Sequence, residues 1–242
     1  MRVRIAQHVF SVHPIWLLIT LTAFAILFNL SWWQLSRASE KTEQLQRLAQ
    51  LQQNGALAPQ QLAALSNTDV DGAPVQGNAR WLSPFIWLLD NQIVDGKVGY
   101  DVIIPVQAEG LSQPLLVNLG WVAASSQRDV LPTPVISPQF QLDALLRTKT
   151  DGLMLLGQNV ENLQQWPMRI QQADIAALSE ISGLSLFPAL LYQQQSDFVP
   201  HYQPVVLPPE KHRGYALQWF LLAVAVVGVA LAASHQGKLK HE

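Results

Sequence analysis

Two long segments without formal charge, one near each end of the chain, constrain this sequence most. No Lys, Arg, Asp or Glu stands between Arg4 and Arg37, and none stands between Arg213 and Lys238. Each segment supplies roughly 20 mostly apolar residues, which as a helix cross a hydrocarbon core of about 30 Å. A helix also satisfies its own backbone hydrogen bonds, which lipid cannot do for it. The sequence therefore predicts a membrane protein with two transmembrane α-helices.

Composition agrees with this interpretation and excludes several function classes. Of the 242 residues, 49% are hydrophobic and 13% are charged, whereas soluble domains carry about 25% charged residues. The chain has no cysteine, which excludes disulfides, zinc fingers, iron–sulfur clusters and thiol nucleophiles. The net charge of -2 and the lack of a basic stripe give no reason to expect a nucleic-acid partner.

The first apolar segment has a second interpretation as a secretory signal. Arg2 and Arg4 precede the apolar run, and Ser36-Arg37-Ala38 loosely fits a cleavage site with small residues. The length of the uncharged run and the bulky Trp32-Trp33 pair favour an uncleaved helix instead. A mature N-terminus at Ser39 would show that the segment is removed.

The charges near the two helices predict the orientation of the chain. The tails, residues 1–11 and 235–242, carry basic residues and are therefore expected in the cytoplasm. These basic residues are Arg2, Arg4, Lys238 and Lys240. The basic residues do not all lie on the tail side of the spans, because the other ends are flanked by Arg37, Lys41, Arg47, Lys211 and Arg213. We expect a multi-pass protein of the bacterial cell inner membrane, with a periplasmic central domain.

The segments between the tails divide by their periodicity. Residues 12–35 and 212–234 are the expected spans, with residues 36–68 as a helical stalk and residues 69–211 as an α+β domain. In the stalk, Asn54-Gly55 is expected to end one helix, and Pro59 is expected to open a short helix to about Leu65.

The central domain alternates apolar and polar residues with the period of a β-strand. This alternation begins at Ala73, and Asp95-Gly96 is typical of a hairpin turn. Strands are expected at 73–81, 85–89, 98–106, 115–122, 139–146, 153–160 and 186–192. A short helix is expected over 174–182, with Gly183 as its end. The order predicts one α+β domain with a mainly antiparallel sheet.

The sequence contains no known catalytic motif, so we expect that the protein is not an enzyme. There is no Gly-x-Ser-x-Gly elbow, no phosphate-binding loop and no His-x-x-x-His pair. Only His201 and His212 lie on the expected outer side, and they stand 11 residues apart, which suggests no metal cage.

One cluster at the start of the second span favours a binding function. His212, Tyr215, Ala216, Trp219 and Ala223 share a helix face. An imidazole ligand above aromatic and small residues suits the flat, apolar ring of a haem, with His212 as the iron ligand.

The first span presents a matching face at the same membrane level. Gln34, Arg37 and Lys41 lie on one side of that helix, and their cations would suit haem propionates. The candidate haem-binding residues are His212, Tyr215, Trp219 and Arg37. In the alternative interpretation, these aromatic and charged residues only anchor the helices at the interface, and the alanines only let helices pack.

Four motifs, in this order and spacing, resemble those of the Surfeit locus protein one family. They are WQLSR at 33–37 followed by Lys41, VGYDVIIP at 98–105, LLVNLGWV at 115–122 and KHRGYALQWF at 211–220. The chain departs from the family where Leu119 replaces the usual Arg of the third motif. It departs again where Glu210 and Lys211 precede His212 in place of the usual Asn. The resemblance covers the whole chain.

The resemblance implies an assembly factor for cytochrome c oxidase. Such a chaperone would deliver haem a to the largest oxidase subunit, with His212 at the position of the family's histidine at the membrane interface. The outer domain would dock on the oxidase or on haem a synthase. Two alternatives stay open: a structural scaffold that binds no haem, and a membrane sensor whose outer domain reads a ligand.

Overall fold

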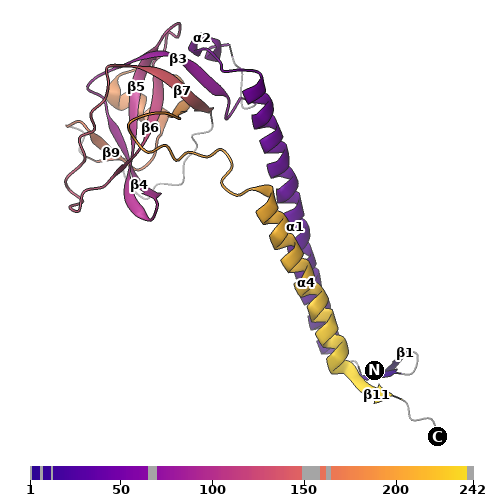
Figure 1. The fold of residues 1–242 in the computed structure, drawn as a ribbon. Helices are drawn as coiled ribbons and strands as arrows, with labels where there is room; N and C mark the ends of the chain where they lie inside the picture. Colours follow the sequence, from indigo (N-terminus) through magenta and orange to yellow (C-terminus); the bar gives the residue numbers. More distant parts are fainter. Residues whose placement is uncertain are drawn as a thin grey trace. The chain divides into compact units, whose positions relative to one another are not determined.

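The chain forms two compact units, one mainly helical and one built on a sheet (Figure 1). The computed structural model describes residues 2–5, 8–11, 13–64, 70–148, 159–161 and 165–238. The helical unit combines residues 1–46 with 205–242, and the sheet unit spans residues 47–204. Two long apolar helices near the ends of the chain thus flank a sheet-rich domain, which confirms the predicted fold class.

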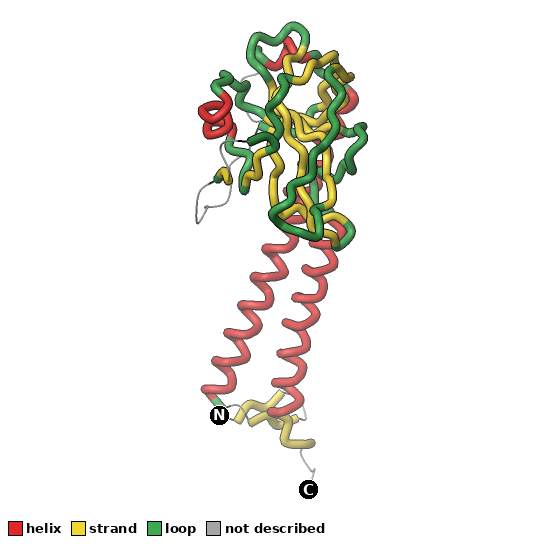
Figure 2. Tube along the Cα trace, turned by 90° about the vertical axis from the view of Figure 1, so that its left-hand side faces the viewer, coloured by secondary structure: helices red, strands yellow, loops and turns green. Residues whose placement is uncertain are grey.

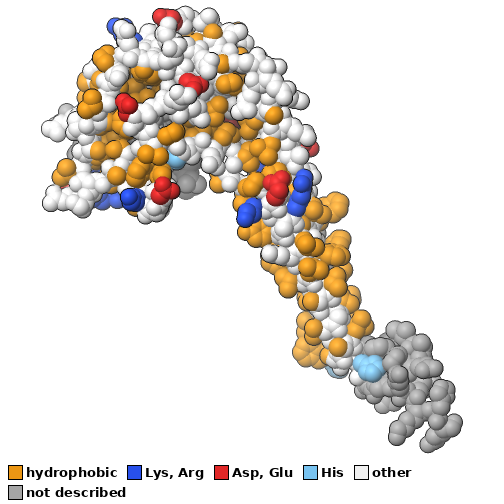
Figure 3. Space-filling view, in the orientation of Figure 1, with side chains coloured by type: hydrophobic (Ala, Val, Ile, Leu, Met, Phe, Trp, Pro, Cys, Tyr) orange, Lys and Arg blue, Asp and Glu red, His pale blue; other side chains and the backbone are white. Residues whose placement is uncertain are grey.

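The helical unit is built on α1 (Pro14–Gln53) and α4 (Pro209–Ser234). Both are long and apolar enough to cross a membrane. In their most apolar windows only 6% and 11% of the residues are buried, which is unlike the core helix of a soluble protein. Hydrophobic side chains cover most of the visible surface of both helices (Figure 3). Exposed apolar faces of this extent are typical of surfaces that contact lipid or another protein.

Small residues form the contact between α1 and α4, which run side by side (Figure 2). The Ser31 hydroxyl donates a hydrogen bond of 2.9 Å to the carbonyl oxygen of Ala216. Both residues are buried, as are Ala38 on α1 and Ala223 on α4. Short side chains let two helix backbones approach closely where no hydrophobic effect drives them together.

Three short strands form a separate antiparallel sheet in the helical unit. They are β1 (Arg2–Ile5), β2 (His8–Ser11) and β11 (His235–Lys238), in the order β1-β2-β11. The segments before α1 and after α4 are therefore joined by backbone hydrogen bonds. These strands were not predicted from the sequence.

The sheet unit contains a closed ring of five strands. An eight-stranded sheet runs in the order β3-β7-β10-β6-β5-β4-β9-β8, and β3 pairs with β5 as well as with β7, which closes the ring. The strands are β3 (Pro74–Trp81), β4 (Trp87–Val94), β5 (Lys97–Ala108), β6 (Leu115–Ala123), β7 (Gln139–Arg147), β8 (Val160–Glu161), β9 (Met168–Ile170) and β10 (Leu190–Gln193). Two pairings, β10 with β6 and β4 with β9, are parallel, and the others are antiparallel. The prediction of a mainly antiparallel sheet is therefore confirmed.

Each face of the central strands packs into its own hydrophobic core. Along β5, Val102 and Ile104 belong to a core with side chains from all five ring strands, which places this core inside the ring. Ile103 points to the opposite face, into a second core that α3 (Ile175–Ser182) covers through Leu178. A strand buried on both faces reads as an uninterrupted apolar run, which explains the sequence VIIPV.

Several predicted turns and caps are confirmed. Asp95 and Gly96 adopt positive φ angles of 50° and 74° between β4 and β5, as a tight hairpin requires. The carboxylate of Asp174 accepts bonds from two backbone N–H groups at the start of α3, and Gly183 ends the helix with a φ of 69°. The helix opened by Pro59 is α2 (Pro59–Leu62), and Leu65 lies outside the described residues.

Other predicted boundaries need correction. The expected strand at 186–192 begins only at Leu190, because Leu186 and Ala189 donate backbone bonds to carbonyl oxygens two residues earlier in the chain. The strand expected at 85–89 begins two residues later, at Trp87, and continues to Val94. The expected strand at 153–160 lies almost wholly outside the described residues.

Candidate functional site

His212 lies in the first turn of α4 and is bonded to a side chain of α1. The helix begins at Pro209, whose fixed φ and missing N–H suit the first helical position. The imidazole is buried, with 8% of the residue exposed. Its Nδ1 lies 2.7 Å from Oε1 of Gln34. An amide oxygen only accepts hydrogen bonds, so Nδ1–H is the donor, and in the neutral form of the ring Nε2 then carries the lone pair.

The other predicted residues on α4 lie at the flank of this contact. Tyr215 is 44% exposed and Trp219 is half-buried. Ala216, by contrast, is buried where Ser31 bonds to its carbonyl oxygen. Helix packing thus occupies the Ala216 side of the predicted face, and the Tyr215 and Trp219 side is the one left for a ligand.

Arg37 makes its contacts within its own helix. Its guanidinium forms an ion pair of 2.7 Å with Glu40 and lies 5.7 Å from the ring centroid of Trp33. It is exposed and lies one helical turn beyond Gln34. The structure therefore brings His212 together with Gln34, whereas the contacts of Arg37 are with Glu40 and Trp33 of its own helix.

The sequence predicts Gln34 on the same helix face as Arg37 and Lys41 but indicates a role only for the two charged residues. The signal that could have identified Gln34 is its place at the end of one span, at the same level as a histidine of the other span.

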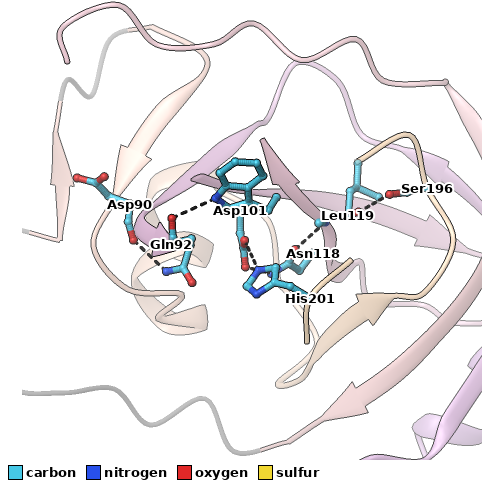
Figure 4. A network of polar contacts seen from close by, with 9 residues as sticks. Asp90, Gln92, Asp101, Asn118, Leu119, Ser196 and His201 are labelled. Carbon is cyan, nitrogen blue, oxygen red and sulfur yellow. Dashed lines mark hydrogen bonds and ion pairs between the residues drawn. The ribbon is translucent and has the colours of Figure 1, made fainter. Parts of the chain in front are cut away.

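A second histidine is bonded in the sheet unit, in a network of buried polar side chains (Figure 4). His201 Nε2 lies 2.6 Å from Oδ1 of Asp101. Asn118 donates to the other carboxylate oxygen of Asp101 at 2.6 Å, and its own Oδ1 accepts from Gly120 N–H at 2.8 Å. Asp101 and Asn118 are buried and come from neighbouring strands, β5 and β6. The sequence places Asp101 in the expected strand 98–106 but indicates no role for it.

The network fastens the segment 196–202 to the sheet. Val199 exchanges two backbone hydrogen bonds with Trp121, at 2.8 and 3.1 Å. Tyr202 stacks on Tyr192 with ring centroids 3.8 Å apart. Burial raises the pKa of Tyr192 to about 12 and also raises the pKa of Tyr202. The contacts hold the chain to the sheet shortly before it enters α4.

Two glycines permit this fastening. Gly120 has a φ of 118°, and a Cβ there would lie 2.8 Å from the Val199 carbonyl oxygen. A Cβ at Gly99 would collide with the Trp121 ring and the Val122 carbonyl oxygen. The Trp121 ring lies over Gly99, and its Nε1–H donates to the Gln92 carbonyl oxygen at 3.1 Å. Trp121 is therefore a packing residue of the sheet unit.

The described residues contain no group of three or more His, Asp or Glu side chains that could hold a metal ion. A cage of protein ligands is therefore not formed in this part of the chain.

The fold and the site define a class of protein: a sheet domain between two apolar helices, with a buried histidine where the helices meet. The chain belongs to the SURF1 family, whose model matches residues 21–224 and so includes both Gln34 and His212. A search of curated proteins found no match. The SURF1 family is associated with cytochrome c oxidase assembly.

Proposed function

We propose that this protein assists cytochrome c oxidase assembly by holding haem a at His212 and delivering it to the largest oxidase subunit. The observation that carries the proposal is the buried imidazole of His212, whose Nδ1 is bonded to Gln34. This bond leaves the Nε2 lone pair as an iron ligand.

The residues around His212 fit a haem. Bound haem supplies a redox-active iron and a broad apolar ring. Tyr215 and Trp219 follow His212 by three and seven residues, so all three lie on one side of α4. Arg37 follows Gln34 by one turn of α1 and would reach a propionate by leaving Glu40, an exposed pair worth at most about 1 kcal/mol.

We place both helices across the cell inner membrane, with the sheet unit in the periplasm and both tails in the cytoplasm. His212 then lies at the outer interface, because it stands in the first turn of α4. A site at this depth would keep the long apolar tail of haem a in lipid. Haem a synthase on the donor side and the largest oxidase subunit on the acceptor side are the partners that we propose.

The oxidase purified from cells tests delivery. With His212→Ala in place of the wild-type chain, we expect oxidase that lacks most of its haem a, while the variant reaches wild-type amounts in the membrane. His13→Ala is the matched control, since His13 is an exposed histidine next to the start of α1. Oxidase with a full haem a content in the His212→Ala strain would contradict delivery and favour a scaffold without haem.

A further inference from the structure

Gln34 is the residue of α1 whose side chain bonds to His212, across 178 positions of sequence. The cations of the same helical region have contacts of their own. Arg37 pairs with Glu40, Lys41 donates to Gln44 at 3.0 Å, and Arg213 donates to Thr42 at 3.3 Å. A neutral amide therefore faces the imidazole in a region with several charged side chains.

We propose that Gln34 is a positioning residue that sets which nitrogen of His212 can bind a ligand. The inference rests on the proposed haem function. Free histidine in water carries its proton mainly on Nε2, the nitrogen that would have to bind iron here. The Gln34 carbonyl oxygen accepts from Nδ1–H, so it holds the proton on Nδ1 and leaves Nε2 unprotonated. The same bond fixes the plane of the ring.

The neutral amide also suits release. A carboxylate in the place of Gln34 would draw the Nδ1 proton more strongly and make the imidazole a stronger iron ligand. A carrier must give its ligand up, so a weaker acceptor serves it better. Gln34 thus sets the orientation of the His212 ring. It strengthens the bond of His212 to iron less than a carboxylate would.

The apoprotein offers a test that needs no haem. The full chain, labelled with ¹⁵N-histidine and placed in lipid nanodiscs, reports by nitrogen chemical shift which ring nitrogen carries the proton. His212→Ala identifies the His212 signals. We expect the Nδ1–H form in the wild type and in Gln34→Glu, and the Nε2–H form in Gln34→Leu. Gln46→Leu, the same change at an exposed position of α1, is expected to keep the wild-type form.

Binding of hemin to the same proteins gives the second readout. Gln34→Leu should weaken hemin binding by about 10-fold, the lower range for loss of a group that orients a ligand. Gln34→Glu should restore the affinity and raise the iron–histidine stretching frequency of the reduced complex above that of the wild type. Gln46→Leu should match the wild type in both measurements.

The outcomes separate this inference from the proposed function. If Gln34→Leu keeps the Nδ1–H form and the wild-type hemin affinity, the positioning role is overturned, even when His212→Ala abolishes binding. If His212→Ala binds hemin as the wild type does, the proposed function fails, and the nitrogen shifts still decide whether Gln34 sets the proton position.

Discussion

Among the described residues, His201 of the sheet unit and His212 of the helical unit are each bonded to a side chain far away in sequence, and the two bonds differ in kind. His201 meets the carboxylate of Asp101, which Asn118 also holds. His212 meets the neutral amide of Gln34. A carboxylate forms an ion pair with a protonated imidazole, whereas an amide oxygen carries no formal charge and accepts one hydrogen bond from the ring. The first arrangement fastens a segment to a sheet, and we propose that the second keeps a nitrogen of His212 available for a ligand.

The largest expected effect is all-or-none and tests whether the C-terminal tail and the sheet unit lie on opposite sides of the membrane. A reporter that is active only in the cytoplasm should be active when fused after Glu242 and silent when inserted near Asn54. A silent fusion after Glu242 together with an active insertion near Asn54 would reverse the proposed orientation.

Trp121→Ala should cause the largest loss of stability in the sheet unit. The change removes a buried ring that lies over Gly99 and leaves the Gln92 carbonyl oxygen without its donor. Truncation of a buried Trp costs about 3–5 kcal/mol, so the amount of folded protein in the membrane should fall. A variant that stays fully folded yet fails to support oxidase assembly would identify Trp121 as a docking residue instead.

Asp101→Ala should have a smaller but clear effect. It leaves Asn118 and His201 without their common acceptor, and removal of one partner of a buried ionic network costs about 3 kcal/mol. The unfolding temperature of the detergent-purified chain, followed by circular dichroism, should fall by roughly 6–12 °C. Asp129→Ala, at an exposed position of a loop, is the control and should change it little. Equal effects of the two variants would show that the network does not stabilise the fold.

The smallest expected effect is a loss of stability in alkali. The phenol of Tyr192 has its pKa raised from 10.0 to about 12, chiefly by burial. The folded state therefore favours the neutral phenol. The stability that this gives is complete below pH 10 and is lost as the pH rises towards 12. Tyr192→Phe keeps the ring against Tyr202 and should show a shallower decline of the unfolding temperature above pH 10. An identical decline would assign the effect to other groups.

The sequence predicted those parts of the fold that depend on neighbours in the chain. Apolar runs and alternation predicted both long helices and most strands, and Asp95-Gly96, Asp174 and Gly183 marked a turn and two helix ends. Closure of the ring through β3 and β5 was not predicted, because it depends on the register between strands far apart in sequence. The bond between His201 and Asp101 was not predicted for the same reason, because the two residues are 100 positions apart in sequence.

Only part of the candidate site could be predicted, and the reason is related. Helical spacing placed His212 and Gln34 at one membrane level, but it does not say which side chains of two helices meet. That depends on where the helices touch, and the contact of Ser31 with Ala216 sets it. The charge of Arg37 favoured it as a ligand-binding residue, but a charged side chain at an exposed position also pairs with residues of its own helix, as Arg37 does with Glu40.

The absorption spectrum of the full-length protein, purified in detergent from cells that make haem a, tests the central claim most directly. The wild type should show the Soret band of bound haem a. In His212→Ala this band should be lost or displaced, while the circular dichroism of the sheet and helices is unchanged. His13→Ala should retain the wild-type band. A His212→Ala protein with the wild-type Soret band would contradict the account, because His212 would then not be the iron ligand.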